Sequence, residues 1–325
     1  MLKQRLRQTC NSSTQEFAAW LRQQPVVIAT DLANSQHYEV PADFFRAVLG
    51  PRLKYSCCMF ENGAQSLAQA EDAMLDLTCE RAGIADGMNI LELGCGWGSL
   101  TLWIAEHYPN CNLTAVSNSR SQKQFMEARC RERGVRNIEV VTANVAEFWA
   151  PGRYDRIVSV EMFEHMRNYE RLLERVASWL LPGGKLFVHI FCHRALAYPF
   201  EIDGDGDWMA RHFFTGGIMP SFHLFDQFDR DFKVRQRWFI DGRHYARTCE
   251  MWLRNLDARR SELNSLFSQG MGKTKASVVL QRWRIFLMAC AELFAFGGGE
   301  QWGVGHYLFE PVHRFARADL MESIR

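Results

Sequence analysis

Two glutamates and a histidine in the segment Glu161-Met162-Phe163-Glu164-His165 are the side chains of this sequence best suited to proton transfer. In a helix that begins at Glu161, positions i, i+3 and i+4 share one face, so the three side chains would point together. Carboxylates attract an ammonium group, which loses its proton only near pH ~10 in water. A carboxylate–imidazole pair can remove that proton at neutral pH as a general base. The segment therefore predicts acid–base chemistry on an amine, and a capping cluster with His165 satisfied in the core is the alternative.

A glycine-rich turn upstream of this segment has the pattern of a ligand site. The apolar run Asn89–Leu93 predicts a buried strand, Gly94, Gly96 and Gly98 follow, and 100–107 predicts a helix. Glycine lets the backbone pass close beneath a ligand, and a helix N-terminus offers free N–H groups. Gly-x-Gly-x-Gly differs from the dinucleotide fingerprint, and Glu92, two positions earlier, resembles the first motif of S-adenosylmethionine (AdoMet) methyltransferases. A glycine turn without a ligand is the alternative.

The composition is that of an ordinary globular protein. The chain has 325 residues, 47% of them hydrophobic and 23% charged, with a net charge of +1, which argues against a nucleic-acid partner. No apolar run is long enough to span a bilayer, and residues 1–24 are too polar for a cleavable signal. The ten cysteines lack Cys-x-x-Cys zinc spacing. We therefore expect a soluble, cytoplasmic protein with free thiols, no metal and no stable membrane insertion.

Alternating helices and strands predict an α/β fold with a doubly wound, mainly parallel, seven-stranded sheet. The expected strands are 88–93, 113–117, 138–142, 154–160, 185–191, 233–240 and 304–309. The expected helices are 67–83, 100–107, 121–133, 169–181, about 245–268 and about 275–295. N-terminal helices in residues 1–66 would pack on the core or cover a substrate cavity. The aromatic stretch at about 194–235 breaks the rhythm and is expected to be a helical lid over the sheet.

Three further segments, taken with the glycine turn, carry a resemblance to a known family. They are Tyr55-Ser56-Cys57-Cys58, Ser117–Gln122 after the second strand and Glu161–Met166 after the fourth. Together they resemble the cyclopropane fatty-acid synthase family of AdoMet-dependent methyltransferases, from about residue 50 onward. The segments 187–193, 213–221, 244–250 and 291–309 are more similar to its coclaurine N-methyltransferase branch. The resemblance implies a class I AdoMet methyltransferase fold, with residues 67–325 as the methyltransferase domain.

The resemblance also implies a cofactor site for AdoMet. Tyr55 and Ser56 would hold the methionine carboxylate, and Ser117 and Gln122 would meet the ribose. Many methyltransferases have an acidic residue after the second strand, where this chain has Ser117-Asn118, a departure that the cyclopropane synthase family shares. The implied set is Tyr55, Ser56, Glu92, Gly94, Gly96, Ser117, Asn118, Gln122, Asn144 and Val145.

Two reactions are compatible with this family. In the N-methyltransferase branch, the residues matching Glu161, Glu164 and His165 bind the substrate and act in catalysis, which implies methylation of a small aromatic or cyclic amine. The rival reaction methylates an unsaturated fatty-acyl lipid, and its bicarbonate is held by side chains matching Cys57, Glu164, His189 and Tyr245.

We favour the amine for two reasons. Phe191 replaces an isoleucine of the bacterial synthases, which also carry a longer N-terminal lipid-engaging domain than the residues before Tyr55. A binding module without catalysis would lack the acid–base cluster. The expected enzyme is a monomer or homodimer. Its expected amine cavity is formed by Cys57, His189, Phe191, Trp208, Phe213 and Tyr245.

Overall fold

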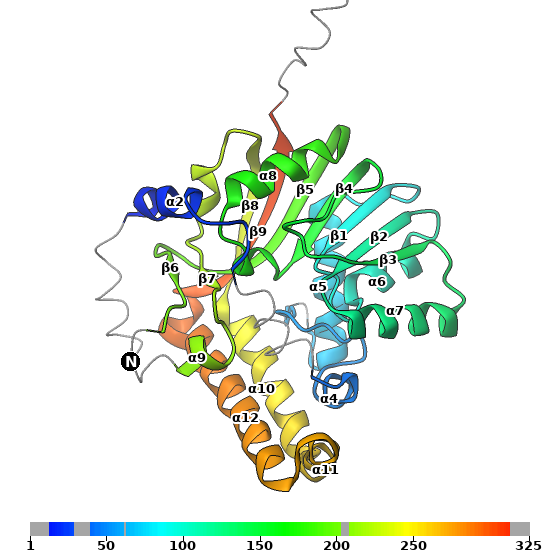
Figure 1. Cartoon of the computed structure of the whole chain (residues 1–325), viewed down its shortest axis with the longest axis vertical. Helices are drawn as coiled ribbons and strands as arrows, with labels where there is room; N and C mark the ends of the chain where they lie inside the picture. Colours follow the sequence, from blue (N-terminus) through cyan, green and yellow to red (C-terminus); the bar gives the residue numbers. More distant parts are fainter. Residues whose placement is uncertain (1–12, 29–39, 62, 203–207, 313–325) are drawn as a thin grey trace, which may run out of the picture.

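A seven-stranded sheet in the order β3-β2-β1-β4-β5-β9-β8 forms the centre of the computed structural model, which describes residues 13–28, 40–61, 63–202 and 208–312 (Figure 1). Strands β1 to β5 run parallel, whereas β9 is antiparallel to both of its neighbours. The expected mainly parallel sheet is therefore confirmed. The strands are β1 (Asn89–Leu93), β2 (Asn112–Ser117), β3 (Ile138–Thr142), β4 (Tyr154–Val160), β5 (Leu180–His193), β8 (Phe232–Ile240) and β9 (Trp302–Pro311).

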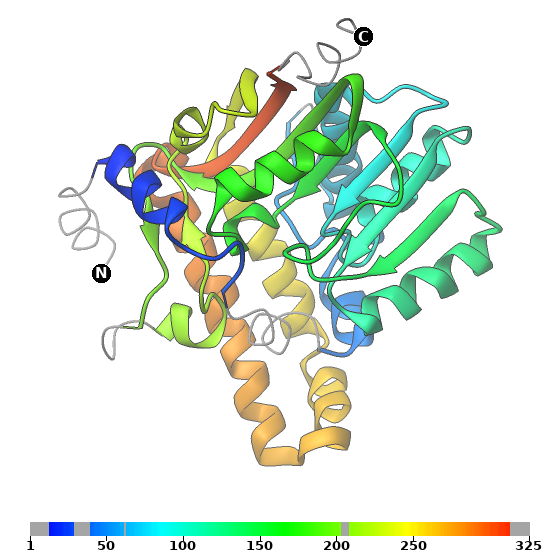
Figure 2. The ribbon, with the colours of Figure 1, turned by 45° about the horizontal axis from the view of Figure 1, so that its top comes forward.

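Helices cover both faces of this sheet. On one face, α5 (Leu67–Ala82) and α6 (Ser99–His107) pack on β1, β2 and β4, while α7 (Arg120–Arg133) packs beside β3. On the other face lie α2 (Thr14–Arg22) and α8 (Tyr169–Ser178), which Figure 2 shows in front of the sheet. Capping boxes begin α2 at Ser13 and α5 at Ser66, since each serine oxygen accepts the N–H of the third helical residue.

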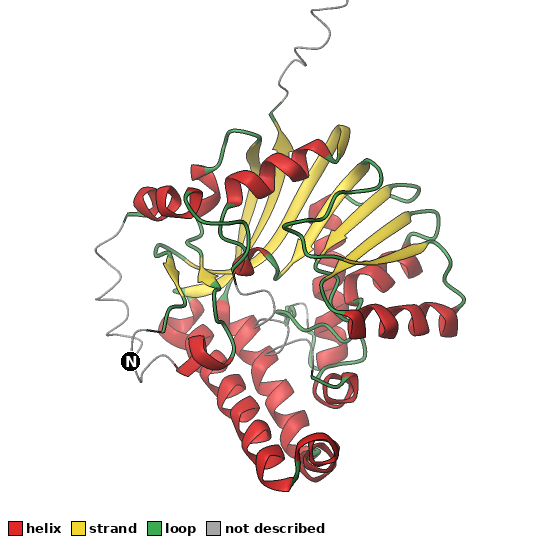
Figure 3. Ribbon diagram, viewed as in Figure 1, coloured by secondary structure: helices red, strands yellow, loops and turns green. Residues whose placement is uncertain are grey.

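A second group of helices extends beyond one end of the strands (Figure 3). It consists of α10 (Gly242–Ala258), α11 (Arg260–Met271) and α12 (Lys273–Ala295), and α4 (Ala42–Val48) packs against α10 and α11. The side chains of α4, α10 and α12 form one apolar cluster with part of the segment 194–235. Of the N-terminal helices, α2 contacts α8 on one face of the sheet, whereas α4 packs on this group.

The segment at about 194–235 differs from the helical lid that the sequence suggests. It holds the two-residue strands β6 (Tyr198–Pro199) and β7 (Ile218–Met219), the short helix α9 (Trp208–His212) and the 3₁₀ turn η4 (Leu224–Gln227). Its described part is mainly loop and bridge, because its aromatic residues follow neither a helical nor a strand period. No helix in the described ranges combines the length and the apolar character needed to cross a bilayer.

Candidate active site

Two adjoining pockets lie where β1, β2, β3 and β4 end. Gly94, Gly96, Gln122 and Glu161 line both of them, so the two are halves of one cleft on either side of the glycine turn. Every residue of the expected cofactor site lines this cleft, and the structure thereby brings that set together. Tyr55, Ser56 and Glu92 line one half, and Ser117, Asn118, Asn144 and Val145 line the other.

The glycine turn leaves room for a ligand at one position and serves packing at another. A Cβ on Gly96, whose φ is +54°, would meet no atom within 4 Å, so open space lies above this backbone. A Cβ on Gly98 would collide with the Met126 sulfur, because α7 packs directly on the turn. Gly96 therefore forms a cradle that a side chain would fill, which is the feature that a bound cofactor requires.

The polar groups of the cleft also fit a ligand with hydroxyl groups. Ser117 Oγ donates to Gln122 Oε1 at 2.6 Å, which leaves the Gln122 amide nitrogen facing the cleft. That buried nitrogen has no hydrogen-bond partner among the described residues. A buried donor without a partner is costly, so the site is suited to an acceptor supplied by a ligand such as the ribose of AdoMet.

Lys54 is a buried cation of this cleft that the sequence analysis missed. Its side chain is 2% exposed, lines the cleft beside Tyr55 and donates to Ser56 Oγ and, at 2.8 Å, to the Cys57 carbonyl oxygen. A lysine directly before Tyr55-Ser56 was the available signal. Glu92 lies in the same half and accepts a hydrogen bond from Thr101. Burial raises the pKa of Glu92 to about 7, against the opposing effect of that bond.

A third pocket, mainly aromatic, adjoins the cleft and has a volume of about 720 Å³ including space open to solvent. Glu161 lines this pocket as well as both halves of the cleft. The expected residues Glu161, Glu164, His165, Phe191 and Tyr245 all lie here. The other lining residues are Tyr55, Phe200, Met209, Phe214, Met219, Cys249, Trp252, Phe286, Cys290, Leu293 and Phe294.

Most of the walls that the sequence analysis missed come from α10 and α12. Tyr245, Cys249 and Trp252 lie on one face of α10, and Phe286, Cys290 and Leu293 lie on one face of α12. Both sets have the spacing i, i+4, i+7, from which the sequence alone could indicate that each set shares one helix face. The same spacing is typical of residues in a hydrophobic core, and only the position of the helices distinguishes the two roles.

Four residues expected in the amine cavity do not line it. Cys57 and His189 are fully buried behind Glu161, to whose carboxylate the Cys57 N–H and the His189 ring bond. Phe213 stacks on Phe286 at 4.1 Å, and Trp208 packs beside Phe213. Phe213 thus packs on α12, and the neighbouring Phe214 lines the pocket in its place.

The backbone conformation that brings the acid–base residues together differs from the expected helix. Glu161 is not in a helix but follows β4 with a φ of +48°, and its N–H donates to the His189 carbonyl oxygen at 2.8 Å. Only Phe163–His165 form a 3₁₀ turn. The expected helix is therefore wrong, yet Glu161, Glu164 and His165 line one pocket as predicted. A non-glycine residue at positive φ is strained and often marks a functional site.

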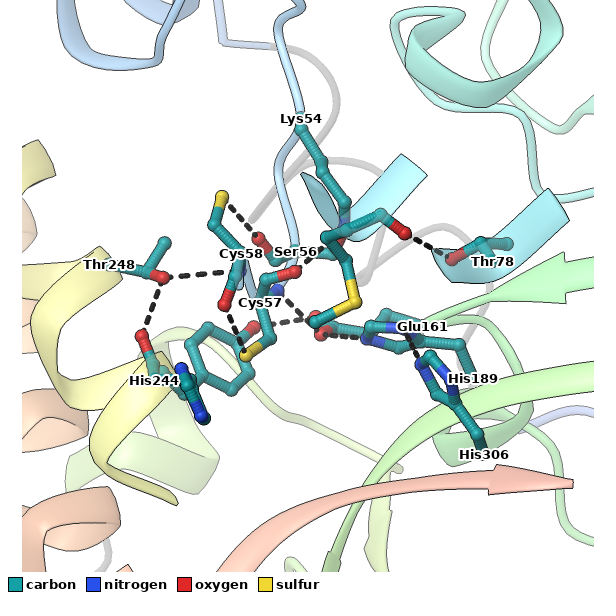
Figure 4. Close-up of polar contacts among 12 residues, drawn as sticks. Lys54, Ser56, Cys57, Cys58, Thr78, Glu161, His189, His244, Thr248 and His306 are labelled. Carbon is teal, nitrogen blue, oxygen red and sulfur yellow. Dashed lines mark hydrogen bonds and ion pairs between the residues drawn. The ribbon is translucent and has the colours of Figure 1, made fainter. Parts of the chain in front are cut away.

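Glu161 and Glu164 have different electrostatic surroundings, and Figure 4 shows those of Glu161. The Glu161 carboxylate accepts hydrogen bonds from Cys57 N at 3.1 Å, His189 Nε2 at 3.2 Å and Tyr245 Oη at 2.5 Å. Burial raises its pKa to about 7, although the Tyr245 bond opposes the shift. Glu164 Oε2 is buried and has no hydrogen-bond partner among the described residues. Burial and the nearby Glu161 raise the pKa of Glu164 well above its ordinary value.

Comparisons with known proteins agree with this geometry. The family model described as mycolic acid cyclopropane synthetase matches residues 29–301. An (S)-coclaurine N-methyltransferase from Thalictrum flavum subsp. glaucum is 40% identical over 95% of this chain and 89% of its own length. A pavine N-methyltransferase from the same plant is 35% identical over 90% of this chain and 83% of its own length.

Solved structures give the same result. A coclaurine N-methyltransferase bound to N-methylheliamine and SAH is 38% identical, with a TM-score of 0.90 over 95% of this chain and 92% of that one. A cyclopropane synthase from Mycobacterium tuberculosis is 26% identical, with a TM-score of 0.75 over 88% of this chain and 99% of that one. The chain therefore belongs to the mycolic acid cyclopropane synthetase family, and it is an AdoMet-dependent methyltransferase.

Proposed function

We propose that this enzyme transfers the methyl group of AdoMet to the nitrogen of a small cyclic or aromatic amine. The observation that carries the proposal is the aromatic pocket with two carboxyl groups and an imidazole, which shares the wall formed by Glu161 with the cofactor cleft. An amine in this pocket would lie beside the cofactor. The names of the relatives, coclaurine and pavine N-methyltransferase, support the same reaction class.

The aromatic pocket would bind the apolar body of the amine and its positive charge. The rings of Tyr245 and Phe294 stack at 4.3 Å, and Tyr55 packs against Trp252 at 5.5 Å. Ring faces attract cations in addition to burying apolar surface. Glu161 adds the carboxylate that would anchor the ammonium group, since all three of its described hydrogen bonds come from donors.

Bound AdoMet supplies an electrophilic methyl group on its sulfonium. The amine can attack that methyl only through a neutral lone pair, so the chain must first remove a proton. Burial raises the pKa of Glu164 well above its ordinary value, which favours its protonated form in the unliganded pocket. Binding of the cationic amine would favour release of the Glu164 proton to solvent, and the ionised Glu164, paired with His165, then accepts the proton of the ammonium group. In-line attack depends mainly on alignment, so positioning would supply most of the acceleration.

The rival reaction on an unsaturated lipid has less support. The resemblance assigns its bicarbonate to side chains matching Cys57, Glu164, His189 and Tyr245. Here the Cys57 side chain is buried outside the pocket, and both His189 and Tyr245 bond to the Glu161 carboxylate. Two of the four groups that would hold bicarbonate, His189 and Tyr245, are thus already engaged by a carboxylate of the chain itself.

A product analysis tests the proposal. Incubation with AdoMet and either a panel of cyclic secondary and tertiary amines or vesicles of unsaturated phospholipid, with and without bicarbonate, is followed by mass spectrometry. We expect methylated amine and no change in the lipid. Glu161→Gln, which keeps the shape and removes the charge, should raise the amine KM while AdoMet binding persists. A bicarbonate-dependent cyclopropanated lipid, with no amine product, would overturn the proposal in favour of the rival.

A further inference from the structure

A continuous line of hydrogen bonds leads away from the Glu161 carboxylate, and Figure 4 shows it from Glu161 through His189 to His306. His189 Nε2 bonds to Glu161 Oε1 at 3.2 Å, and His189 Nδ1 bonds to His306 Nε2 at 2.8 Å. Arg81 Nη1 then bonds to His306 Nδ1 at 3.0 Å. The two histidines face each other across β5 and β9, and both are 0% exposed. Arg81 belongs to the last turn of α5.

The direction of this line is fixed by its far end. Arginine has only donors, so His306 Nδ1 must accept the hydrogen bond from Arg81. A neutral imidazole carries one N–H, which places the His306 proton on Nε2 and makes His189 Nδ1 an acceptor. The His189 proton is then on Nε2, where it donates to Glu161. One arrangement of protons satisfies every partner.

The same reasoning excludes a charged His189. An imidazolium donates from both ring nitrogens, so His306 Nε2 would have to accept from His189 while His306 Nδ1 accepts from Arg81. A His306 ring with two acceptor nitrogens carries no proton, which a neutral imidazole does not allow. Burial lowers the pKa of both histidines well below the ordinary value, in agreement with the geometry.

We propose that Arg81 and His306 are positioning residues that hold His189 as a neutral donor to Glu161, so that Glu161 remains the anionic anchor for the amine. This inference rests on the proposed function, and it also assigns the substrate proton to Glu164 and His165. If His189 could take up a proton, it would form an ion pair with Glu161 and neutralise the charge that the amine needs.

Other groups that face this line contribute to its charge balance. The protonation of Glu161 is coupled to four neighbours, which are Lys54, Glu164, Tyr245 and Cys57. Lys54 also affects the protonation of both histidines. Glu61 and Glu80 act on Arg81 from the outer side. Apart from Glu161, Arg81 is the one group among these that bonds directly to the histidine pair in the described residues, which makes it the residue to change.

The tautomers can be read directly by NMR on the unaltered enzyme. Long-range ¹H–¹⁵N spectra of ¹⁵N-histidine-labelled protein, assigned with His189→Asn and His306→Asn, distinguish the two tautomers and the imidazolium. We expect both rings to carry their proton on Nε2 between pH 6 and pH 8. An Nδ1-protonated or charged ring at either position would overturn the inference, whether or not any variant folds.

Kinetics provide the second test. In Arg81→Met, His306 can carry its proton on Nδ1, and His189 can then take up a proton at low pH. Loss of one partner of a charged hydrogen-bonded group weakens an equilibrium constant by roughly 10- to 100-fold. We expect the amine KM to rise by about that factor near pH 6 and to recover as the pH rises, with AdoMet affinity unchanged. Arg81→Lys keeps a group that only donates and should restore most of the wild-type profile.

Arg156→Met is the matched control. Arg156 is also half-buried beside α5, but it donates to the Ala82 and Gly83 carbonyl oxygens and not to the histidines. Equal pH profiles for Arg81→Met, Arg156→Met and wild type would overturn the inference. The proposed function has its own readout: if the wild-type enzyme forms no methylated amine, the proposed function fails, whereas an active wild type and an impaired Glu161→Gln with a normal Arg81→Met defeat the positioning role alone.

Discussion

The cofactor cleft and the amine pocket share the wall formed by Glu161 but are constructed in different ways. The cleft is built from the glycine turn and the loops that follow β1, β2, β3 and β4. The sheet therefore fixes the positions of its polar side chains and backbone groups. The pocket is built largely from aromatic and sulfur-bearing side chains of α10, α12 and the segment 194–235. From this difference we expect that the scaffold determines the cofactor and that the added elements determine the substrate.

The strongest test of this division is Gly96→Val. A valine Cβ would enter the open space above the turn and would also be strained at a φ of +54°. We expect AdoMet affinity to fall by more than ~100-fold, which corresponds to about 3 kcal/mol of binding free energy. Gly87→Val is the control, because Gly87 has a φ of +86° and open space but lies outside the cleft. Equal calorimetric affinities for the two folded variants would contradict a cofactor cradle at Gly96.

The next effect concerns the acid–base residues. Glu164→Ala and His165→Ala should each lower kcat by about 10²–10⁴-fold while AdoMet still binds, because a general base contributes that factor. If the two act as a unit, the double variant loses less than the product of the single losses. Higher pH should partly rescue His165→Ala, because solvent then supplies neutral amine. Near-normal turnover by both single variants at neutral pH would show that the proton is removed elsewhere.

Two adjacent phenylalanines allow a smaller and sharper test of the pocket. Phe214 lines it, whereas Phe213 stacks on Phe286 behind the wall. We expect Phe214→Leu to change relative rates across an amine panel by about 3- to 10-fold, since a lost ring contact costs about 1 kcal/mol. Phe213→Leu should lower the free energy of unfolding by about 1 kcal/mol and leave the relative rates unchanged. If Phe213→Leu changed selectivity more than Phe214→Leu, the assigned wall would be wrong.

The smallest expected effect is on stability. Burial raises the pKa of Glu164 in the folded state above its ordinary value of 4.5. Above that pH the unfolded chain loses this proton while the folded chain retains it, so the free energy of unfolding falls as the pH rises. Glu161, with a pKa of about 7, adds to the fall up to that pH. Glu164→Gln cannot ionise, and it should raise the unfolding midpoint by a few degrees at pH 8 but not at pH 4.

Thermal unfolding across this pH range checks the effect. Glu132→Gln, at an exposed position of α7, should leave the profile unchanged. A Glu164→Gln protein that is less stable than wild type at pH 8 would indicate that Glu164 is ionised and paired in the folded enzyme.

The cleft could be predicted from the sequence because its signals are local. The run from Asn89 to Gly98 alone specifies a strand, a tight turn and a helix, and every cofactor residue that the motifs implied lines the cleft. The predictions of fold class, family, cofactor and enzyme class are confirmed. The roles of individual residues, the domain boundary at residue 66, the compartment and the oligomeric state stay predictions.

The pocket could be predicted only in part because side-chain direction there depends on tertiary contacts. Trp208 and Phe213 were plausible cavity residues by composition, yet Phe213 packs on α12 and Trp208 packs beside Phe213. The faces of α10 and α12 have the period of a buried helix, which does not distinguish a cavity wall from a core. His306 gave no local signal, since its partner His189 is 117 residues away along the chain.

The position of β9 between β5 and β8 has a consequence for the order of folding. A strand that pairs with β5 over so long a sequence separation closes a large loop, and such contacts form slowly. During synthesis the parallel strands β1 to β5 emerge before β9, and the edge of β5 stays unpaired until β9 arrives. We expect a nascent chain arrested before β9 to acquire the AdoMet cleft without the histidine pair that supports Glu161, and to be prone to aggregation at the open edge of β5.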